Sequence, residues 1–169
     1  KWWKNGPVAL LPTRNLHNRR DRVLSDLITE TTFQENVVCS TWEELVDICG
    51  APLVAQGSVL PQFLQSVKET ILEFGSYMVL LDDIAFFHGR PEAGVKEISM
   101  SLSMLKEPVY LGSRRILAAF MFAAIDNESH IDLLGELGEQ LDDEEFLYLL
   151  RNHGSKEDIF KKGAQRCAP

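Results

Sequence analysis

Residues 97–104 alternate strictly between apolar and polar side chains. The apolar members, which share one side of an extended chain, are Ile98, Met100, Leu102 and Met104. This period of two predicts a β-strand whose methionine-bearing side packs on helices. Residues 115–125 form a long apolar run, which predicts a central strand covered on both faces.

Two helices are predicted before these strands. Ser40-Thr41-Trp42-Glu43 has the spacing of a capping box, and the helix that it opens ends at Gly57. Its expected apolar face consists of Leu45, Val46, Cys49 and Leu53. The second helix begins at Pro61 and ends at Gly75. Its expected apolar face consists of Phe63, Leu64, Val67, Ile71 and Leu72.

Shorter elements complete the pattern. We expect a short helix over residues 22–29 and strands over 35–39, 77–81 and 84–87, the last two separated by two aspartates. Further helices are expected near residue 130, over 142–150 and after the cap at 155–158. Helices that alternate with strands predict an α/β fold, a mixed β-sheet flanked by helices on both faces.

Composition and length set the class of protein. The 169 residues, of which 45% are hydrophobic, suit one domain over residues 22–165, preceded by a leader or inter-domain linker over residues 1–21. No signal peptide and no apolar run of about 18–20 residues is visible, so we expect no membrane insertion. The three cysteines lack metal-ligand or disulfide spacing, which favours the cytoplasm.

The net charge of −8 is unevenly distributed. Residues 1–22 hold six basic residues and one aspartate, a sum of +5, which leaves −13 for the rest. Such an acidic domain repels phosphate backbones, so we expect no direct nucleic-acid binding by it.

His88 is the main candidate for chemistry. It ends the apolar run at 84–87, and Gly89 and Arg90 follow, so the chain can turn sharply and offer a cation to phosphate oxygens. His130 stands near the expected start of a helix, where amide groups favour a phosphoryl group. A neutral imidazole is a good nucleophile towards phosphorus. The alternative is a structural or solvated histidine.

The acidic run Asp142-Asp143-Glu144-Glu145 has two interpretations. It could hold a cation, but carboxylates in a first helical turn are common because they favour the helix dipole. We therefore predict no metal site there.

A resemblance to a known family extends this interpretation. HGRPEAGV after an apolar strand, PVYLG at 108–112 and AAIDNESHIDLL at 123–134 resemble the enzyme IIA domains of the bacterial sugar phosphotransferase system, in the ascorbate-like branch of the fructose–mannitol superfamily. EFGSYMVL at 73–80 and STWEEL at 40–45 are similar to further motifs of that branch. The likeness covers about residues 22–160.

The resemblance implies roles for particular residues. His88 corresponds to the histidine that accepts a phosphoryl group from phospho-HPr, His130 to the second active-site histidine, and Arg90 to the arginine after the active histidine. With Gly89, Arg90 is expected to stabilise the phosphate. Phe87 and Ser76 depart from the family, which usually has proline at both positions. No cofactor is implied.

Three roles are compatible with this resemblance. The domain could be the regulatory C-terminal part of a sugar-operon transcription regulator, which we favour because the chain lacks an initiating methionine and has a linker-like leader. It could instead be a transport component that passes its phosphoryl group to a cysteine of enzyme IIB. Phe87 fits a third role, a degenerate packing domain. The expected partners are phospho-HPr, enzyme IIB and other domains of the parent chain.

Overall fold

The structure is a computed structural model that describes residues 24–164. The predicted leader over residues 1–21 and Cys167 lie outside the described residues. The helices (α), 3-10 turns (η) and strands (β) are, in chain order, α1 (Leu24–Leu27), β1 (Phe33–Val37), α2 (Trp42–Ala55), α3 (Pro61–Phe74), η2 (Gly75–Met78), β2 (Asp83–His88), η3 (Pro91–Ala93), β3 (Ser99–Leu111), β4 (Arg114–Ala123), α4 (Asn127–Leu141), α5 (Glu144–Arg151) and α6 (Lys156–Ala164).

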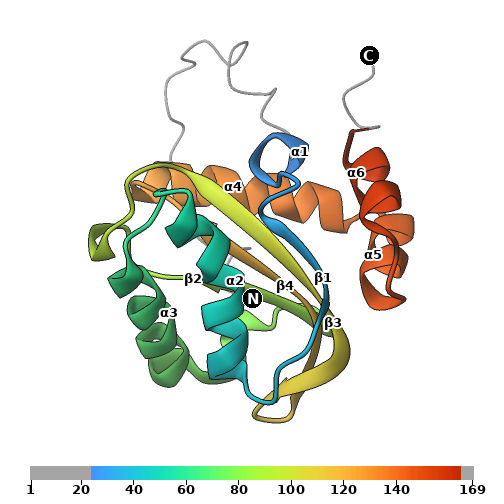
Figure 1. Ribbon diagram of the computed structural model, residues 1–169, viewed down its shortest axis with the longest axis horizontal. Helices are drawn as coiled ribbons and strands as arrows, with labels where there is room; N and C mark the ends of the chain where they lie inside the picture. The colour runs from blue at the N-terminus through green and yellow to red at the C-terminus, as the bar shows by residue number, and fades with distance from the viewer. Residues whose placement is uncertain (1–23, 165–169) are drawn as a thin grey trace, which may run out of the picture.

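The four strands form one mixed sheet in the order β1-β3-β4-β2. The central strands β3 and β4 are antiparallel, whereas β1 runs parallel to β3 and β2 runs parallel to β4. Helices α2 and α3 cover one face of this sheet, and α4, α5 and α6 cover the other (Figure 1). The predicted α/β fold, a mixed sheet with helices on both faces, is confirmed.

Strict alternation in β3 sends its side chains into two different cores. The methionine-bearing side packs under α4 and α5, as predicted. The serine side is also buried, because α2 covers it: Ser101 Oγ donates to the carbonyl of Cys49 at 2.6 Å, and Gln34 Nε2 donates to Ser103 Oγ at 3.2 Å. Hydrogen bonds thus satisfy these two hydroxyls, which are inaccessible to water.

Two local predictions were wrong. Tyr77 and Met78 belong to the turn η2 rather than to a strand, because Gly75, at φ 65°, ends α3 and the N–H of Val79 donates to the carbonyl of Ser76. A short apolar run has no period that could distinguish a turn from a strand. Leu72 is 74% exposed, since it lies about 100° around the helix from the buried Ile71.

The predicted capping box is shifted by one residue. Thr41 is the N-cap of α2, and its side chain accepts from the N–H of Glu44 at 3.2 Å, while the Glu44 carboxylate accepts from the N–H of Ser40 at 2.7 Å. Serine and threonine both suit an N-cap, and Ser40 and Thr41 are each followed three positions later by a glutamate, so the local sequence fits either position. The burial of Leu45 and Val46 against the sheet fixes the rotation of the helix and so selects Thr41.

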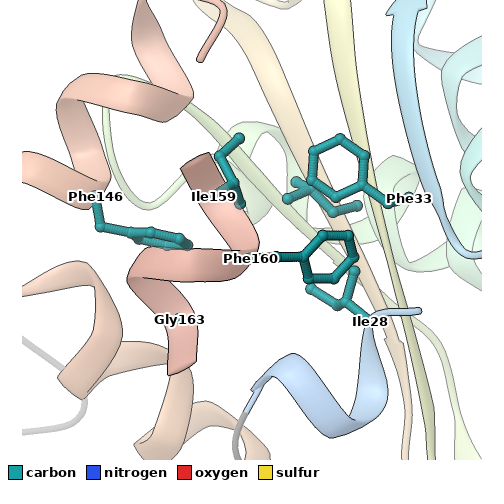
Figure 2. A pocket seen from close by; sticks show the side chains of 7 residues that line it. Ile28, Phe33, Phe146, Ile159, Phe160 and Gly163 are labelled. Carbon is teal, nitrogen blue, oxygen red and sulfur yellow. The ribbon is translucent and has the colours of Figure 1, made fainter. Parts of the chain in front are cut away.

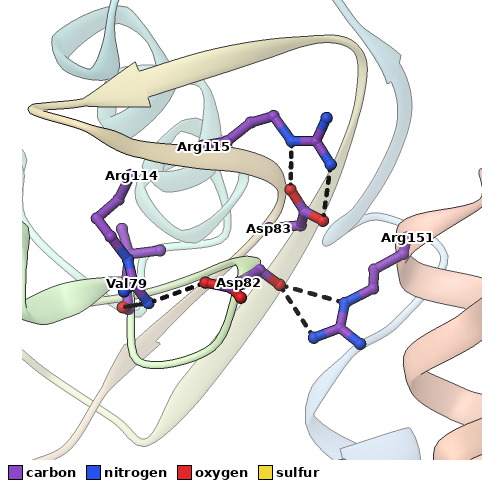
Figure 3. A network of polar contacts seen from close by, with 6 residues as sticks. All are labelled: Val79, Asp82, Asp83, Arg114, Arg115 and Arg151. Carbon is purple, nitrogen blue, oxygen red and sulfur yellow. Dashed lines mark hydrogen bonds and ion pairs between the residues drawn. The ribbon is translucent and has the colours of Figure 1, made fainter.

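A group of arginines anchors the chain just before β2 (Figure 3). Arg115 makes a two-pronged ion pair with Asp83, at 2.6 and 3.0 Å, and Arg151 donates twice to the carbonyl of Asp82. Arg114 donates to the carbonyl of Val79 at 2.9 Å. These bonds tie the amino end of β2 to β4 and to α5, which fixes the strand that carries His88.

No helix within residues 24–164 combines the length and the apolar character that crossing a bilayer requires.

Candidate functional site

The site lies where two parallel strands end. His88 is the last residue of β2 and pairs with Phe122 of β4, and the chain then leaves β4 at Ala123 and enters α4 at Asn127. The carboxyl ends of parallel neighbours lie at the same edge of a sheet. The structure therefore brings His88 and His130 to one edge.

The orientation of His88 is fixed by its own strand. Its Nδ1 atom lies 3.0 Å from the carbonyl oxygen of Phe86. A carbonyl oxygen can only accept, so Nδ1 must carry the proton and donate it. The neutral ring then has its lone pair on Nε2, which is the nucleophilic atom of this tautomer.

The ring of His88 is in mutual contact with two other rings. The imidazoles of His88 and His130 meet edge to face, with centroids 4.9 Å apart and planes at 72°. The ring of Phe122 stacks on His88 at 5.1 Å and 22°, and is tilted towards His130 at 5.3 Å and 54°. Phe122 therefore contacts both candidate catalytic rings from within the sheet.

Both imidazoles are neutral near pH 7. Burial and, to a smaller extent, the nearby His130 lower the pKa of His88 from 6.5 to about 4, although the hydrogen bond to the carbonyl of Phe86 opposes this shift. Burial also lowers the pKa of His130. A neutral His88 keeps its Nε2 lone pair available at physiological pH.

His130 lies in the first turn of α4 rather than at its cap. Asp126 is the N-cap and forms a reciprocal capping box with Ser129, and the N–H of His130 already donates to the carbonyl of Asp126 at 3.1 Å. The side chain of His130, not its amide, is therefore the group that meets His88.

Gly89 and Arg90 are held by α3. A Cβ atom on Gly89 would lie 3.0 Å from the Phe63 ring and 3.1 Å from Ser66 Oγ, closer than ordinary contact, so the backbone here packs tightly against α3. The N–H of Arg90 donates to Ser66 Oγ at 3.0 Å. The guanidinium of Arg90 is more than half exposed and pairs with Glu73 at 3.4 Å. The structure thus joins Arg90 to α3 rather than to the histidine pair.

Two site residues are absent from the sequence-based prediction. Phe122 lies in an apolar run where nothing distinguishes it from Phe120, and only the pairing of β2 with β4 places it against His88. Ser66 lies among apolar residues on the buried face of α3 and is 7% exposed. A polar residue on a buried helix face was the available signal for Ser66.

The acidic run at 142–145 caps a helix. Asp143 is the N-cap of α5, and its carboxylate accepts from the N–H groups of Glu145 and Phe146 at 3.0 and 3.1 Å. Lys162 of α6 pairs with both Asp143 and Glu145. In the described part of the chain, no three His, Cys, Asp or Glu side chains are grouped so that they could hold a metal ion.

An apolar pocket lies on the β1 side of the sheet, whereas His88 ends the other outer strand, β2 (Figure 2). Its lining residues come from the segment after α1 and from β1, β3, α5 and α6; they are Ile28, Phe33, Leu102, Phe146, Ile159, Phe160 and Gly163. No titratable group lines it, so it offers none of the nucleophilic or acid–base chemistry of the histidine pair.

Comparison with protein families matches residues 26–162 to the family described as "Phosphoenolpyruvate-dependent sugar phosphotransferase system, EIIA 2". The chain is 29% identical to the mannitol-specific cryptic phosphotransferase enzyme IIA component of Escherichia coli strain K12, over 83% of this chain and 99% of that protein. It is 31% identical to the ascorbate-specific PTS system EIIA component of the same strain, over 70% of this chain and 80% of that protein.

Solved structures give the same result. The solution structure of the mannitol-specific cryptic enzyme IIA from Escherichia coli aligns with a TM-score of 0.75 and 29% identity, covering 83% of this chain and 99% of that one. A chain of the Escherichia coli complex of enzyme IIA for mannitol with phosphorylated enzyme IIB aligns with a TM-score of 0.72 and 25% identity, covering 83% of this chain and all of that one.

Proposed function

This chain belongs to the EIIA 2 family of the phosphoenolpyruvate-dependent sugar phosphotransferase system, and we propose that it is a phosphocarrier that accepts a phosphoryl group from phospho-HPr on Nε2 of His88. One observation carries the proposal. It is the geometry of the His88 imidazole, which is fixed at a strand end by a hydrogen bond from Nδ1 to the carbonyl of Phe86, with the centroid of the His130 ring 4.9 Å from its own.

The chemistry requires only this chain and a phosphorylated donor. The Nε2 lone pair attacks phosphorus, the bond from phosphorus to the donor breaks, and that electron pair stays with the donor. The ring becomes more positive as the bond forms. The carbonyl of Phe86 accepts from Nδ1–H and so stabilises that charge. The step needs no metal or organic cofactor.

The neighbours of His88 stabilise the transferred group. His130 is neutral and donates a ring N–H to a phosphoryl oxygen. Gly89 lets the chain after His88 pass close to α3, which holds the nucleophile's end of β2 in place. Arg90 reaches the phosphate when its guanidinium leaves Glu73, which costs little because this ion pair is exposed and long.

Phe87 does not obstruct this reaction. Its side chain is fully buried with α2 and α3, on the face of the sheet opposite to the side chain of His88. Proline is tolerated on edge strands such as β2, so proline and phenylalanine are both compatible with this position. The position of Phe87 thus supports an active carrier over a degenerate packing domain.

From His88 the phosphoryl group passes to a cysteine of an enzyme IIB partner. The similarity to the enzyme IIA chain of a complex with phosphorylated enzyme IIB supports this step. The cysteine thiolate attacks the phosphorus of phospho-His88, and the electron pair of the broken bond returns to Nε2.

Phosphorylation of the purified domain tests the proposal. The domain is incubated with phosphoenolpyruvate, enzyme I and HPr, and acid-labile phosphate is located by mass spectrometry. We expect one phosphate on the wild type and none on His88→Ala. His153→Asn is the matched control, since His153 is an exposed histidine at φ 54°, a conformation that asparagine tolerates. Label that survives in His88→Ala, or is missing from the wild type, would contradict the assignment.

The regulatory role in a sugar-operon transcription regulator stays a prediction. Deletion of this domain from the parent gene distinguishes it from a transport role. Loss of operon control with normal sugar uptake by pre-induced cells is expected for a regulator. Loss of uptake with normal transcription would identify a transport component.

A further inference from the structure

Phe122 and Phe120 occupy equivalent positions on one face of β4. Phe120 pairs with Phe86 of β2 and Phe122 pairs with His88, so two aromatic pairs lie in successive rungs of the sheet. Phe86 and Phe120 stack at 5.8 Å with planes 3° apart, and His88 and Phe122 stack at 5.1 Å with planes 22° apart. The second rung therefore repeats the first, with an imidazole in place of one phenyl ring.

The stacking partner restricts how His88 can turn. The terminal torsion of histidine is broad and roughly two-fold, so a ring without a flat neighbour samples many tilts. Phe122 is only 1% exposed and is fixed by strand pairing, so its face defines the plane of the imidazole. Two orientations of the ring, related by a flip, share that plane, and the hydrogen bond from Nδ1 to the carbonyl of Phe86 selects one of them.

Phe122 also contacts the second histidine. Its ring lies 5.3 Å from that of His130, in addition to its stack on His88. Because the Phe122 ring touches both imidazoles, its replacement by a side chain of another shape alters the angle between the two imidazole planes. Positioning errors of about 1 Å between reacting groups can cost up to about a hundredfold in rate.

We propose that Phe122 is a positioning residue of the phosphocarrier site: it fixes the plane of the His88 imidazole, keeps Nδ1 on the carbonyl of Phe86 and thereby aims Nε2 at the incoming phosphorus. This inference rests on the proposed phosphorylation of His88. It assigns Phe122 no contact with the phosphoryl group.

The test compares Phe122→Leu with Phe120→Leu. Both variants replace a buried phenyl ring by an apolar side chain on the same face of the same strand, but only Phe122 touches the histidines. The tautomer of His88 is measured by nitrogen chemical shifts of the unphosphorylated domain. The rate of phosphoryl transfer is measured over a range of phospho-HPr concentrations.

We expect Phe122→Leu to shift His88 from pure Nδ1–H to a mixture of tautomers. The maximal transfer rate should fall about tenfold with an unchanged half-saturating concentration of phospho-HPr, because docking is intact and alignment is lost. Phe120→Leu should change neither quantity. If Phe122→Leu does not fold, Phe122→Met replaces it under the same criteria.

Two results would overturn the inference. One is an unchanged tautomer and a rate within twofold of wild type in Phe122→Leu, and the other is an equal loss in both variants, which would indicate general packing. The tautomer measurement needs no phosphorylation. A wild type that is not labelled on His88 would thus refute the proposed function, while the tautomer shift would still decide the role of Phe122.

Discussion

At the scale of the single residue, the environment of His88 determines its chemistry. Partial burial keeps the ring neutral, and one hydrogen bond assigns the proton to Nδ1. A histidine in water has neither constraint. Its position at the end of β2 thus gives this histidine the neutral ring and the Nε2 lone pair that the proposed role requires.

Burial of His88 makes folding stability depend on pH. Its pKa is about 4 in the folded chain and 6.5 as the ordinary value, so between these pH values the unfolded chain binds a proton that the folded chain does not. Stability is therefore greatest above the ordinary value and falls as pH falls from about 7 to about 4, by at most about 3 kcal/mol from this group. Below the folded-state pKa this contribution no longer changes.

Denaturant unfolding at pH 7 and pH 4 checks this prediction on the wild type and on His88→Gln. The contributions of the titrating groups that both proteins share cancel when the change in unfolding free energy of one is subtracted from that of the other. The wild type should lose more stability than the variant over this range. An equal loss in both would show that His88 is not buried as a neutral group.

His130 should assist phosphorylation without being essential. His130→Ala removes a hydrogen-bond donor to the phosphoryl group but leaves the nucleophile, so the transfer rate should fall roughly a hundredfold and not to zero. Rapid-quench kinetics with phospho-HPr measures the rate, and the thermal midpoint controls for folding. A rate equal to that of wild type would remove His130 from the mechanism.

At the scale of the element, the contact between α3 and the end of β2 positions the proposed nucleophile. Ser66 accepts from the N–H of Arg90, and Phe63 lies against the backbone at Gly89. A helix face that had been expected only to fill the core thus also fixes the two residues after His88.

Gly89→Ala should therefore destabilise the domain and slow phosphorylation. The added methyl group would lie 3.0–3.2 Å from three side chains of α3, so these side chains would have to shift, and such overpacking costs about 1–3 kcal/mol. Gly135→Ala is the matched control, because a Cβ at this helical glycine of α4 meets nothing within 4 Å. It should stabilise the domain by about 0.5–1 kcal/mol. Thermal unfolding of both variants is the measurement, and equal effects would contradict the close approach.

At the scale of the whole molecule, one face of the sheet carries two regions of different character. The histidine pair lies at the carboxyl ends of β2 and β4, and the apolar pocket lies on the β1 side of the sheet. The residues that line the pocket are different from the aromatic residues that contact His88. Packing at the pocket and chemistry at the histidines are therefore separable.

Ile159→Ala tests this separation. Ile159 is 4% exposed and lines the pocket between α6 and α5, so its truncation should cost about 2–4 kcal/mol. Phosphorylation of His88 at 25 °C should be unchanged while the variant remains folded. Leu72→Ala, at a side chain that is 74% exposed, should alter neither stability nor activity. A loss of phosphorylation in folded Ile159→Ala would mean that the two regions are coupled.

The sequence by itself determined the features that depend on near neighbours in the chain. Alternation identified the two faces of β3, helical spacing together with Pro61 and Gly75 bounded α3, and the order of residues at 84–90 placed a histidine at a strand exit. These features follow from periods of 2 and 3.6 residues and from turn residues, which act within a few positions.

Only the tertiary structure decided which residues surround His88. Phe122 is 34 positions away from it and reaches it through the parallel register of β2 and β4, and Ser66 reaches Arg90 through the packing of α3. Packing of α2 against the sheet selected Thr41 as the cap of that helix, and packing of α3 left Leu72 on its outer side. Register between strands that are not consecutive depends on how whole faces fit together, and no local pattern carries that information.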